Sequence, residues 1–304
     1  MELHTIQALK EGLDAAGISY REQEPLSAHT TFKIGGPAAV FAQPVQEDQL
    51  CGAIALCKEL SVPYYVLGNG SNILFGDKGW SGAVICLAKL RGEVHQEGNT
   101  LWAPAGMPLN MLCMAALRAG LAGLEFAYGI PGTVGGAVYM NAGAYGGEMK
   151  DVLVSVRHLN AQGEIVETPA SALDLSYRHS IFEESGDCIL SAKVSLTPGD
   201  PEKISEQMNE LMGRRRDKQP LDKPSAGSAF KRPAGAFAGA LIDQCGLRGY
   251  RHGGAAISEK HCGFVVNLGG ATCEDVLALC QKVQNIVKEK TGYTLEKEIR
   301  VVEG

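Results

Sequence analysis

The segment over residues 123–151 constrains this chain more than any other stretch of its sequence. It carries seven glycines between positions 129 and 147, six of them in IPGTVGG and NAGAYGG. Each glycine adds conformational entropy to the unfolded chain, so a packed helix or strand tolerates few of them. We therefore predict a long loop over 123–151, and we favour contact of its backbone with a ligand over a purely structural turn.

A second glycine segment, GNGSN at 68–72, directly follows the short apolar run YYVL at 64–67, which we predict to be a strand. Such a turn offers unblocked amides with serine and asparagine side chains, which can hold a phosphate, but an ordinary tight turn fits equally well. The sequence contains neither G-x-G-x-x-G nor a Gly-Lys pair, which excludes the Rossmann fingerprint and the P-loop. Two glycine segments together suggest an extended dinucleotide.

Length, charge and cysteine usage limit the class of protein. At about 150 residues per domain, 304 residues suggest two domains. No apolar run approaches the roughly 20 residues of a membrane-spanning helix, and residues 1–17 predict an amphipathic helix rather than a signal peptide, so we expect no membrane association or export. Nine scattered cysteines without a C-x-x-C pair favour reduced core thiols in the cytoplasm, and we expect no metal site.

The formal charge of −6 argues against nucleic acid as a partner. One basic cluster, RRRDK at 214–218, stands out on this acidic chain. Cations favour the last turn of a helix, so a solvated helix end is the simpler interpretation. A phosphorylated small molecule is the functional alternative for the same cluster.

Periodicity and capping signals predict the regular elements and one domain boundary. Asp200 and Pro201 predict the start of a helix, and Thr272, Asp275 and Gly292 bound a later one. Ser228 falls in a predicted loop, where an ordinary hydroxyl is the default interpretation. We place the domain boundary near residue 200. The other predicted elements are helices over 46–60 and 107–119, strands over 152–159, 164–167 and 188–196, and a closing strand over 294–302 that puts Glu296, Glu298 and Arg300 on one face.

Taken together, these segments resemble the UDP-N-acetylenolpyruvoylglucosamine reductases over nearly the whole chain. The matching motifs follow one another in the family's order: TTFKIGG, VLGNGSNILF, the 123–151 segment, SYRHSIF, RRRDKQP, AGSAFKRP and LEKEIRVV. The resemblance implies an α+β fold, in which an FAD-binding domain of the vanillyl-alcohol oxidase (PCMH) type precedes a smaller α+β substrate-binding domain. The corresponding ranges here are 1–199, with subdomains of about 1–82 and 83–199, and 200–304, whose last strand, 294–302, returns to the active site.

The resemblance also assigns roles to individual residues, including Tyr177, Arg178 and Glu298, which by themselves would be interpreted as surface or ion-pair residues. Arg178 matches the family's active-site arginine, Ser228 its proton donor and Glu298 its catalytic glutamate. Substrate contacts are implied for Tyr177, Lys218 and Arg232, with Lys218 on the diphosphate. FAD contacts are implied for Gly68, Asn69, Gly70, Ser71, Asn72, Gly132, Thr133, Gly135, Gly136, Asn141, Ala142, Gly143, Ala144, Arg215 and Arg300.

The implied activity is NADPH-dependent reduction of UDP-N-acetylglucosamine enolpyruvate to UDP-N-acetylmuramate in peptidoglycan synthesis. FAD is held non-covalently, NADPH is the co-substrate, and the enzyme is expected to be a cytoplasmic monomer. Only residues 183–199 separate SYRHSIF from the next helix, which resembles the shorter type of the family; Arg232 stands where the longer type has asparagine. Two alternatives stay open: another FAD oxidoreductase of the same fold, and a non-catalytic protein that binds flavin or a UDP-sugar.

Overall fold

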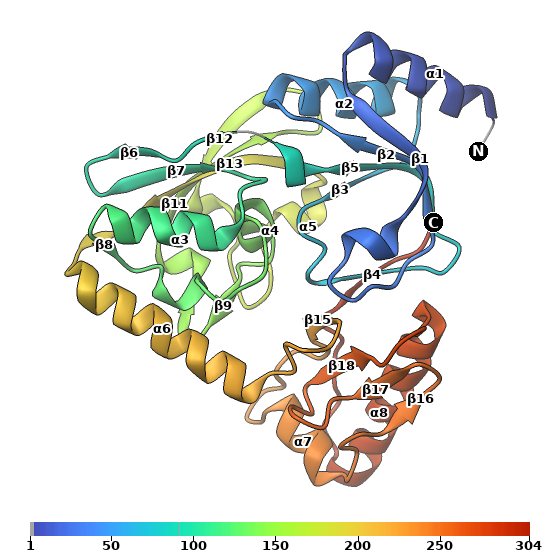
Figure 1. Cartoon of the computed structure of the whole chain (residues 1–304), viewed down its shortest axis with the longest axis vertical. Coiled ribbons are helices and arrows are strands. Elements are labelled where there is room, and N and C mark those ends of the chain that lie inside the picture. The colour runs from blue at the N-terminus through green and yellow to red at the C-terminus, as the bar shows by residue number, and fades with distance from the viewer. Residues whose placement is uncertain (1–2, 91) are drawn as a thin grey trace. The chain divides into compact units, whose positions relative to one another are not determined.

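The computed structural model describes residues 3–90 and 92–304, and these divide into two compact units (Figure 1). Unit 1 contains residues 3–21, Val40–Asn69 and Gly82–Arg215. Unit 2 contains Glu22–Ala39, Gly70–Ser81 and Arg216–Gly304. The chain therefore passes between the units five times. The predicted division at 199/200 concerns which part binds flavin and which binds substrate, and it stays a prediction.

The N-terminal part of unit 1 combines two packed helices with a four-stranded sheet. α1 (Leu3–Ala15) packs against α2 (Glu47–Glu59). The sheet has the order β1-β2-β5-β3, with β3 and β5 parallel. Three of its strands, β1, β2 and β5, continue across the boundary into unit 2. The strands are β1 (Ser19–Pro25), β2 (Pro37–Gln43), β3 (Tyr64–Leu67) and β5 (Trp80–Cys86).

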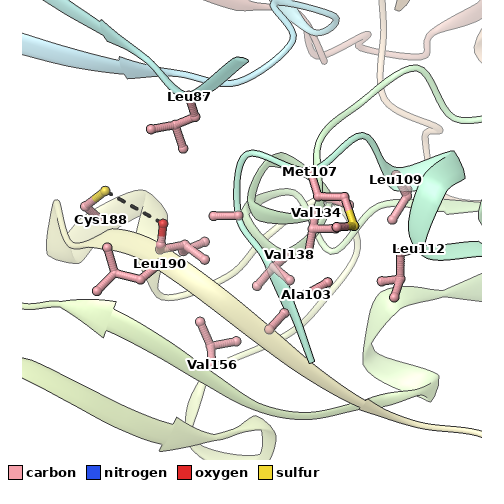
Figure 2. Close-up of a cluster of buried hydrophobic side chains, with 14 of the residues drawn as sticks. Leu87, Ala103, Met107, Leu109, Leu112, Val134, Val138, Val156, Cys188 and Leu190 are labelled. Atoms are coloured by element: carbon pink, nitrogen blue, oxygen red, sulfur yellow. Dashed lines mark hydrogen bonds between the residues drawn. The ribbon is translucent and has the colours of Figure 1, made fainter. Parts of the chain in front are cut away.

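A second, antiparallel sheet of order β12-β11-β13-β7-β6 forms the rest of unit 1. Its strands are β6 (His95–Glu97), β7 (Thr100–Pro104), β11 (Leu153–Leu159), β12 (Ile165–Pro169) and β13 (Cys188–Ser195). α4 packs against β13 and β7, and its Val134 and Val138 lie beside Met107 in the buried core (Figure 2). The remaining elements are α3 (Leu109–Arg118), β8 (Leu121–Ala122), α4 (Val134–Tyr139), β9 (Gly143–Ala144), β10 (Gly147–Glu148), α5 (Phe182–Ser185) and β14 (Thr197–Pro198).

Unit 2 has its own apolar core under an antiparallel sheet of order β15-β18-β17-β16. α8 packs against β16, β17 and α7, and β19 pairs in parallel with β4. These elements are β4 (Ile73–Phe75), β15 (Ser225–Ser228), α7 (Ala238–Gln244), β16 (Arg251–His252), β17 (Ala255–Ile257), β18 (Phe264–Asn267), α8 (Cys273–Thr291) and β19 (Arg300–Val302). α6 (Pro201–Lys218) runs through the boundary between Arg215 and Arg216.

The local capping signals are confirmed. The Asp200 side chain accepts a hydrogen bond from the Glu202 amide at the start of α6, at 3.0 Å. α8 begins with the capping box of Thr272 and Asp275 and ends at Gly292 with a left-handed φ of 78°. The helices expected over 46–60 and 107–119 and the strands expected over 64–67, 152–159, 164–167 and 188–196 are also present, within a few residues at their ends.

Three predictions about local structure are wrong. The 123–151 segment is not all loop: Val134–Tyr139 forms α4, because the Thr133 side chain caps it and its valines reach the core. Ser228 ends strand β15 instead of lying in a loop. The closing strand spans only Arg300–Val302; before it, the chain pairs through the single bridge Phe230↔Lys297, and Pro233 soon ends that partner segment.

The expected burial of the cysteines is confirmed, since all nine are free and eight of them are buried. Burial raises the pKa of Cys57, Cys113 and Cys188 to about 12, because the thiolate is poorly solvated in the core. Among the described residues, no helix has both the length and the apolar character that a membrane crossing requires.

Candidate active site

In unit 1 the two glycine segments predicted from sequence meet. The Asn69 side-chain amide donates a hydrogen bond to the Pro131 carbonyl at 2.6 Å. A Cβ atom on Gly68 would lie 2.6 Å from the Thr133 hydroxyl, so only glycine allows this approach. Gly68 and Gly132 are half-buried and Gly136 is exposed, which leaves main-chain peptides at this junction uncovered by side chains.

Several residues assigned to the flavin by resemblance have their hydrogen bonds satisfied within the protein. The Gly135 amide donates to the Ala105 carbonyl at 2.9 Å, and a Cβ on Gly135 would lie 2.8 Å from the Ala105 methyl group. The Thr133 hydroxyl accepts from the Gly136 amide at 3.2 Å. The Ala142 amide donates to the Ala137 carbonyl at 2.7 Å. The structure thus explains Thr133, Gly135 and Ala142 by packing and helix capping.

Asn141 is the most completely enclosed of the predicted flavin contacts, with no exposed surface. Its side-chain amide donates to a Glu148 carboxylate oxygen at 3.0 Å and to the Ser176 carbonyl at 2.8 Å. Its side-chain carbonyl accepts from the Lys150 amide at 2.9 Å. Both donor hydrogens are used, so the side chain of Asn141 holds protein segments together. Its neighbours Gly143 and Ala144 are half-exposed in the β9–β10 hairpin.

Arg178 lies at the tip of a tight hairpin in unit 1. Ser176 and His179 exchange two backbone hydrogen bonds of 3.2 Å, which leaves Tyr177 and Arg178 as the two turn residues. Arg178 has a φ of +57°, a left-handed conformation that costs a residue with a side chain about 1–2 kcal/mol. Its guanidinium donates to the Gly143 carbonyl at 3.1 Å and lies 4.9 Å from the centre of the Tyr177 ring. Tyr177 itself is exposed.

Arg215, the other predicted arginine of unit 1, is half-buried near the end of α6. Its side chain packs against Gly129, where an added Cβ would lie 3.2 Å from the arginine Cδ atom. Burial lowers the pKa of Arg215, while the nearby Tyr145 acts in the opposite direction. Arg214, in contrast, is exposed and pairs with Glu210 one helical turn earlier. Only part of the basic cluster is therefore a solvated helix end.

In unit 2, Asn72 connects two of the predicted site residues. Its side-chain amide donates to the Glu298 carbonyl at 3.3 Å, and its backbone carbonyl accepts from the Arg300 amide at 3.1 Å. Gly70 has a φ of +60°, and a Cβ there would lie 2.2 Å from the His29 carbonyl. The second part of GNGSN, residues 70–72, thus leads into the strand pair β4–β19. Ser71, Glu298 and Arg300 are all half-buried.

Ser228 and Glu298 lie on neighbouring chain segments of unit 2. The Glu298 amide donates to the carbonyl of Ala229, the residue after Ser228, at 2.9 Å. The register of β15 on β18 shifts between Ser225 and Ser228, and Gly227 has a φ of +76° within this bulge. A bulge re-aims the side chain that follows it, so the glycine in AGS determines where the Ser228 hydroxyl points. Both Ser228 and Glu298 remain partly accessible.

The two remaining predicted substrate residues also belong to unit 2. Lys218 is the exposed last residue of α6. Arg232 follows the Ser228 segment, and its guanidinium lies 4.6 Å from the centre of the ring of Phe237. The predicted site residues thus form two groups, one per unit, with Arg178 in unit 1 and Ser228 and Glu298 in unit 2.

The residues that sequence reasoning missed are supports. Thr31 donates its hydroxyl hydrogen to the Ser225 carbonyl at 2.6 Å, which ties the TTFKIGG segment to β15. Asp77 accepts from the Cys273 and Glu274 amides at 2.7 and 3.1 Å, so it caps α8 together with Thr272. Glu148 holds Asn141. The only sequence signal for Glu148 is its position directly after NAGAYGG, because the residues that it contacts come together only in the folded chain.

This fold is that of an FAD-binding protein. A family model described as FAD binding domain matches residues 37–169, which include most of unit 1. The residues fit the cofactor, because the backbone at Gly132 and Gly136 is at least partly exposed and carries no side chain, so a dinucleotide can approach it closely. A second model, described as UDP-N-acetylenolpyruvoylglucosamine reductase, C-terminal domain, matches residues 219–302.

Relatives of known name cover nearly the whole chain. The UDP-N-acetylenolpyruvoylglucosamine reductase of Caldanaerobacter subterraneus subsp. tengcongensis is 49% identical over 279 residues, 92% of each chain. That of Agathobacter rectalis is 47% identical over 98% of each chain. The crystal structure of the Thermus caldophilus reductase (MurB) matches with a TM-score of 0.78 and 37% identity, covering 93% of this chain and 98% of that one. The protein belongs to the UDP-N-acetylenolpyruvoylglucosamine reductase family.

Proposed function

We propose that this protein reduces UDP-N-acetylglucosamine enolpyruvate to UDP-N-acetylmuramate with bound FAD and with NADPH as the reductant, in bacterial peptidoglycan synthesis. The 49% identity to a reductase of that name, over 92% of both chains, carries the proposal. The roles proposed below are supported by Arg178 on a strained hairpin and by the pairing of the Glu298 amide with Ala229, next to Ser228. The same proposal has the enzyme acting as a cytoplasmic monomer, without a nucleic acid or membrane partner.

The chemistry divides between the cofactor and the chain. FAD, when bound, would supply the hydride that C3 of the enol ether receives. Arg178 binds the substrate carboxylate and stabilises the negative charge that spreads onto it, because a fixed cation stabilises charge that grows during the reaction. Ser228 donates its hydroxyl proton to C2. Glu298 orients the intermediate that receives this proton or helps to protonate it. One hydride and one proton together complete the reduction of the double bond.

Substrate binding falls to the charged residues that end α6 and follow β15. Lys218 is a compact, exposed point charge, suited to one end of a diphosphate. Arg232, stacked on the Phe237 ring, adds a second cation for the substrate. Nicotinamide and enolpyruvate must use the flavin in turn, so NADP⁺ leaves before the substrate reacts and the kinetics are ping-pong.

The test is a flavin absorbance experiment on the purified protein. We expect non-covalent FAD that acid precipitation releases, bleaching near 450 nm on addition of NADPH, and recovery of the colour with UDP-N-acetylglucosamine enolpyruvate. An FAD oxidase of another specificity would bleach with its own substrate and would not recover with enolpyruvate. A binding protein would be yellow without NADPH-dependent bleaching, and either result would refute the proposal.

A further inference from the structure

We propose that Asn141 is a positioning residue that holds Arg178 in place, and that its side chain makes no contact with the flavin. The proposal rests on the proposed function only in giving Arg178 its role on the substrate carboxylate. The structural part, that Asn141 supports the Arg178 hairpin, stands on the contacts of unit 1 alone.

The end of α4 and the chain after it contact the Arg178 hairpin at every second residue, from Tyr139 to Gly143. The contacts are the Ser180 hydroxyl to the Tyr139 carbonyl at 2.7 Å, the Asn141 amide to the Ser176 carbonyl at 2.8 Å, and the Arg178 guanidinium to the Gly143 carbonyl at 3.1 Å. Asn141 is thus the middle contact, and it holds the base of the turn on which Arg178 stands. Residues 139–143 and 176–180 form one assembly.

The hairpin needs this support because its tip is strained. Arg178 adopts a left-handed φ of +57°, and such a conformation persists in a residue with a side chain only where the surroundings impose it. Two backbone hydrogen bonds of 3.2 Å between Ser176 and His179 close the turn. A two-residue turn has few contacts of its own, so a buried bond at its base helps to determine where the tip lies.

Asparagine suits position 141 for two independent reasons. Its φ is +38°, and asparagine enters the left-handed region more readily than most residues with a side chain. Its amide also supplies two donors at once, to Ser176 and to the carboxylate of Glu148. The Lys150 ammonium beside Glu148 holds the pKa of that carboxyl below its usual value, with Asn141 and Arg178 acting in the same direction. Glu148 therefore remains an ionised acceptor for Asn141.

The experiment compares Asn141→Gly with Asn160→Gly in the purified holoenzyme. Glycine adopts the left-handed φ without strain, so Asn141→Gly removes the side-chain bonds without straining the native backbone. Asn160 lies at the start of an exposed turn of the same unit, and its side chain bonds to the nearby Glu164, while its backbone bonds to Glu164, Gly163 and the Lys58 ammonium. The measurements are flavin content, amide hydrogen exchange at residues 176–179, and the rates of bleaching by NADPH and of reoxidation by enolpyruvate substrate.

For Asn141→Gly we expect full flavin content and an unchanged rate of bleaching by NADPH. The amides of Ser176 and His179 should exchange about tenfold faster and reoxidation should slow about tenfold, the effect of one lost buried hydrogen bond. Combining it with Arg178→Ala should cost no more in reoxidation rate than Arg178→Ala alone, because one residue acts through the other. Asn160→Gly should match the wild type throughout.

Loss of flavin with unchanged exchange at 176–179 would overturn the proposal and restore Asn141 as a flavin contact. Additive losses with Arg178→Ala would also overturn it. If Asn141→Gly does not give folded holoenzyme, Asn141→Asp keeps the size and the acceptor, deletes both donors and places a second carboxylate beside Glu148, so effects at least as large are expected. If wild-type enzyme is not reoxidised by the enolpyruvate substrate, the proposed function fails, whereas hydrogen exchange still decides whether Asn141 supports the hairpin.

Discussion

Arg178 and Ser228 are held by two different kinds of support. The hairpin of Arg178 is fastened to the rest of unit 1 by side-chain bonds from Asn141, Ser180 and the arginine itself. Ser228 lies in a main-chain ladder, where β15 pairs with β18 and the Ala229 amide donates to the Gly263 carbonyl at 2.7 Å. On its other side, the Ala229 carbonyl accepts from the Glu298 amide.

The difference predicts how each region responds to substitution. Main-chain bonds do not depend on which side chain a position carries, so truncating the Ser228 side chain should have a local, chemical effect. Side-chain bonds disappear with the residue that makes them, so the geometry of the hairpin depends on residues distant in sequence. A substitution at Ser228 should therefore affect the reaction without disturbing the structure, whereas substitutions around Arg178 should affect both.

Ser228→Ala has the largest expected effect and tests the local half of this comparison. General acid catalysis contributes about 10²- to 10⁴-fold, so the reoxidation of the reduced flavin by substrate should slow by about that factor or more. Bleaching by NADPH needs no proton at C2 and should keep nearly its wild-type rate. Stopped-flow absorbance follows each half separately, with Ser225→Ala at the other end of the same strand as the matched control.

Two outcomes would contradict this assignment in different ways. Normal reoxidation of Ser228→Ala would remove Ser228 as the proton donor and leave Glu298 or a bound water in that role. Equal slowing of both half-reactions would show that the hydroxyl shapes the flavin pocket. The second outcome would also break the comparison, because a main-chain ladder should confine the effect of one lost hydroxyl.

Lys218→Ala should have the next largest effect and should act on substrate binding alone. A charge-assisted contact to the diphosphate is worth roughly 1.5–3 kcal/mol, so the KM for the UDP-substrate should rise about ten- to hundredfold. The KM for NADPH should change far less. Arg214→Ala removes a positive charge from the same helix, where Arg214 pairs with Glu210, and serves as the control. Equal increases in both KM values would refute the assignment of Lys218 to the diphosphate.

Sequence predicted best what local signals determine. The sequence predicted the start of α6 and both ends of α8. Their caps, Asp200, Thr272 and Gly292, lie next to the residues that they cap. The two glycine segments were found, and they do meet, through Asn69 and Pro131. What the glycines do there differs from one position to the next, because Gly135 is required by Ala105, a partner that no local pattern identifies.

The same limit explains the local errors. α4 was hidden because glycines lower helix propensity, while the contacts that stabilise it, from β7 and β13, come from the folded core. Ser228 was placed in a loop because its ladder partner, Phe264, lies far along the chain. The side-chain bonds of Asn141 to Ser176 and Glu148 were not foreseen either, because only folding brings these residues together. The assignment of Asn141 to the flavin stays a prediction, to which our proposal of a supporting role is the alternative.

The smallest expected effect tests the side-chain half of the comparison through pH. His179 closes the Arg178 hairpin, and its imidazole lies 3.2 Å from a Glu183 carboxylate oxygen and 3.3 Å from one of Asp174. Glu183 in the first place, and then Asp174, raise the pKa of His179 above its usual value. A raised pKa in the folded state means that the protonated imidazole stabilises the fold. This stabilisation is complete below a pH of about 6.5 and is lost as the pH rises through the raised value.

His179→Gln should therefore lower the thermal unfolding temperature more at pH 6 than at pH 8.5. Exposed ion pairs contribute at most about 1 kcal/mol, so the difference between the two pH values should be about 1–3 °C. His95→Gln removes an imidazole from an exposed strand of the same unit and should show no such difference. If the two variants respond to pH alike, the carboxylates beside His179 contribute nothing measurable. The hairpin would then depend on its backbone bonds and on the contacts of Asn141, Ser180 and Arg178 that join it to residues 139–143.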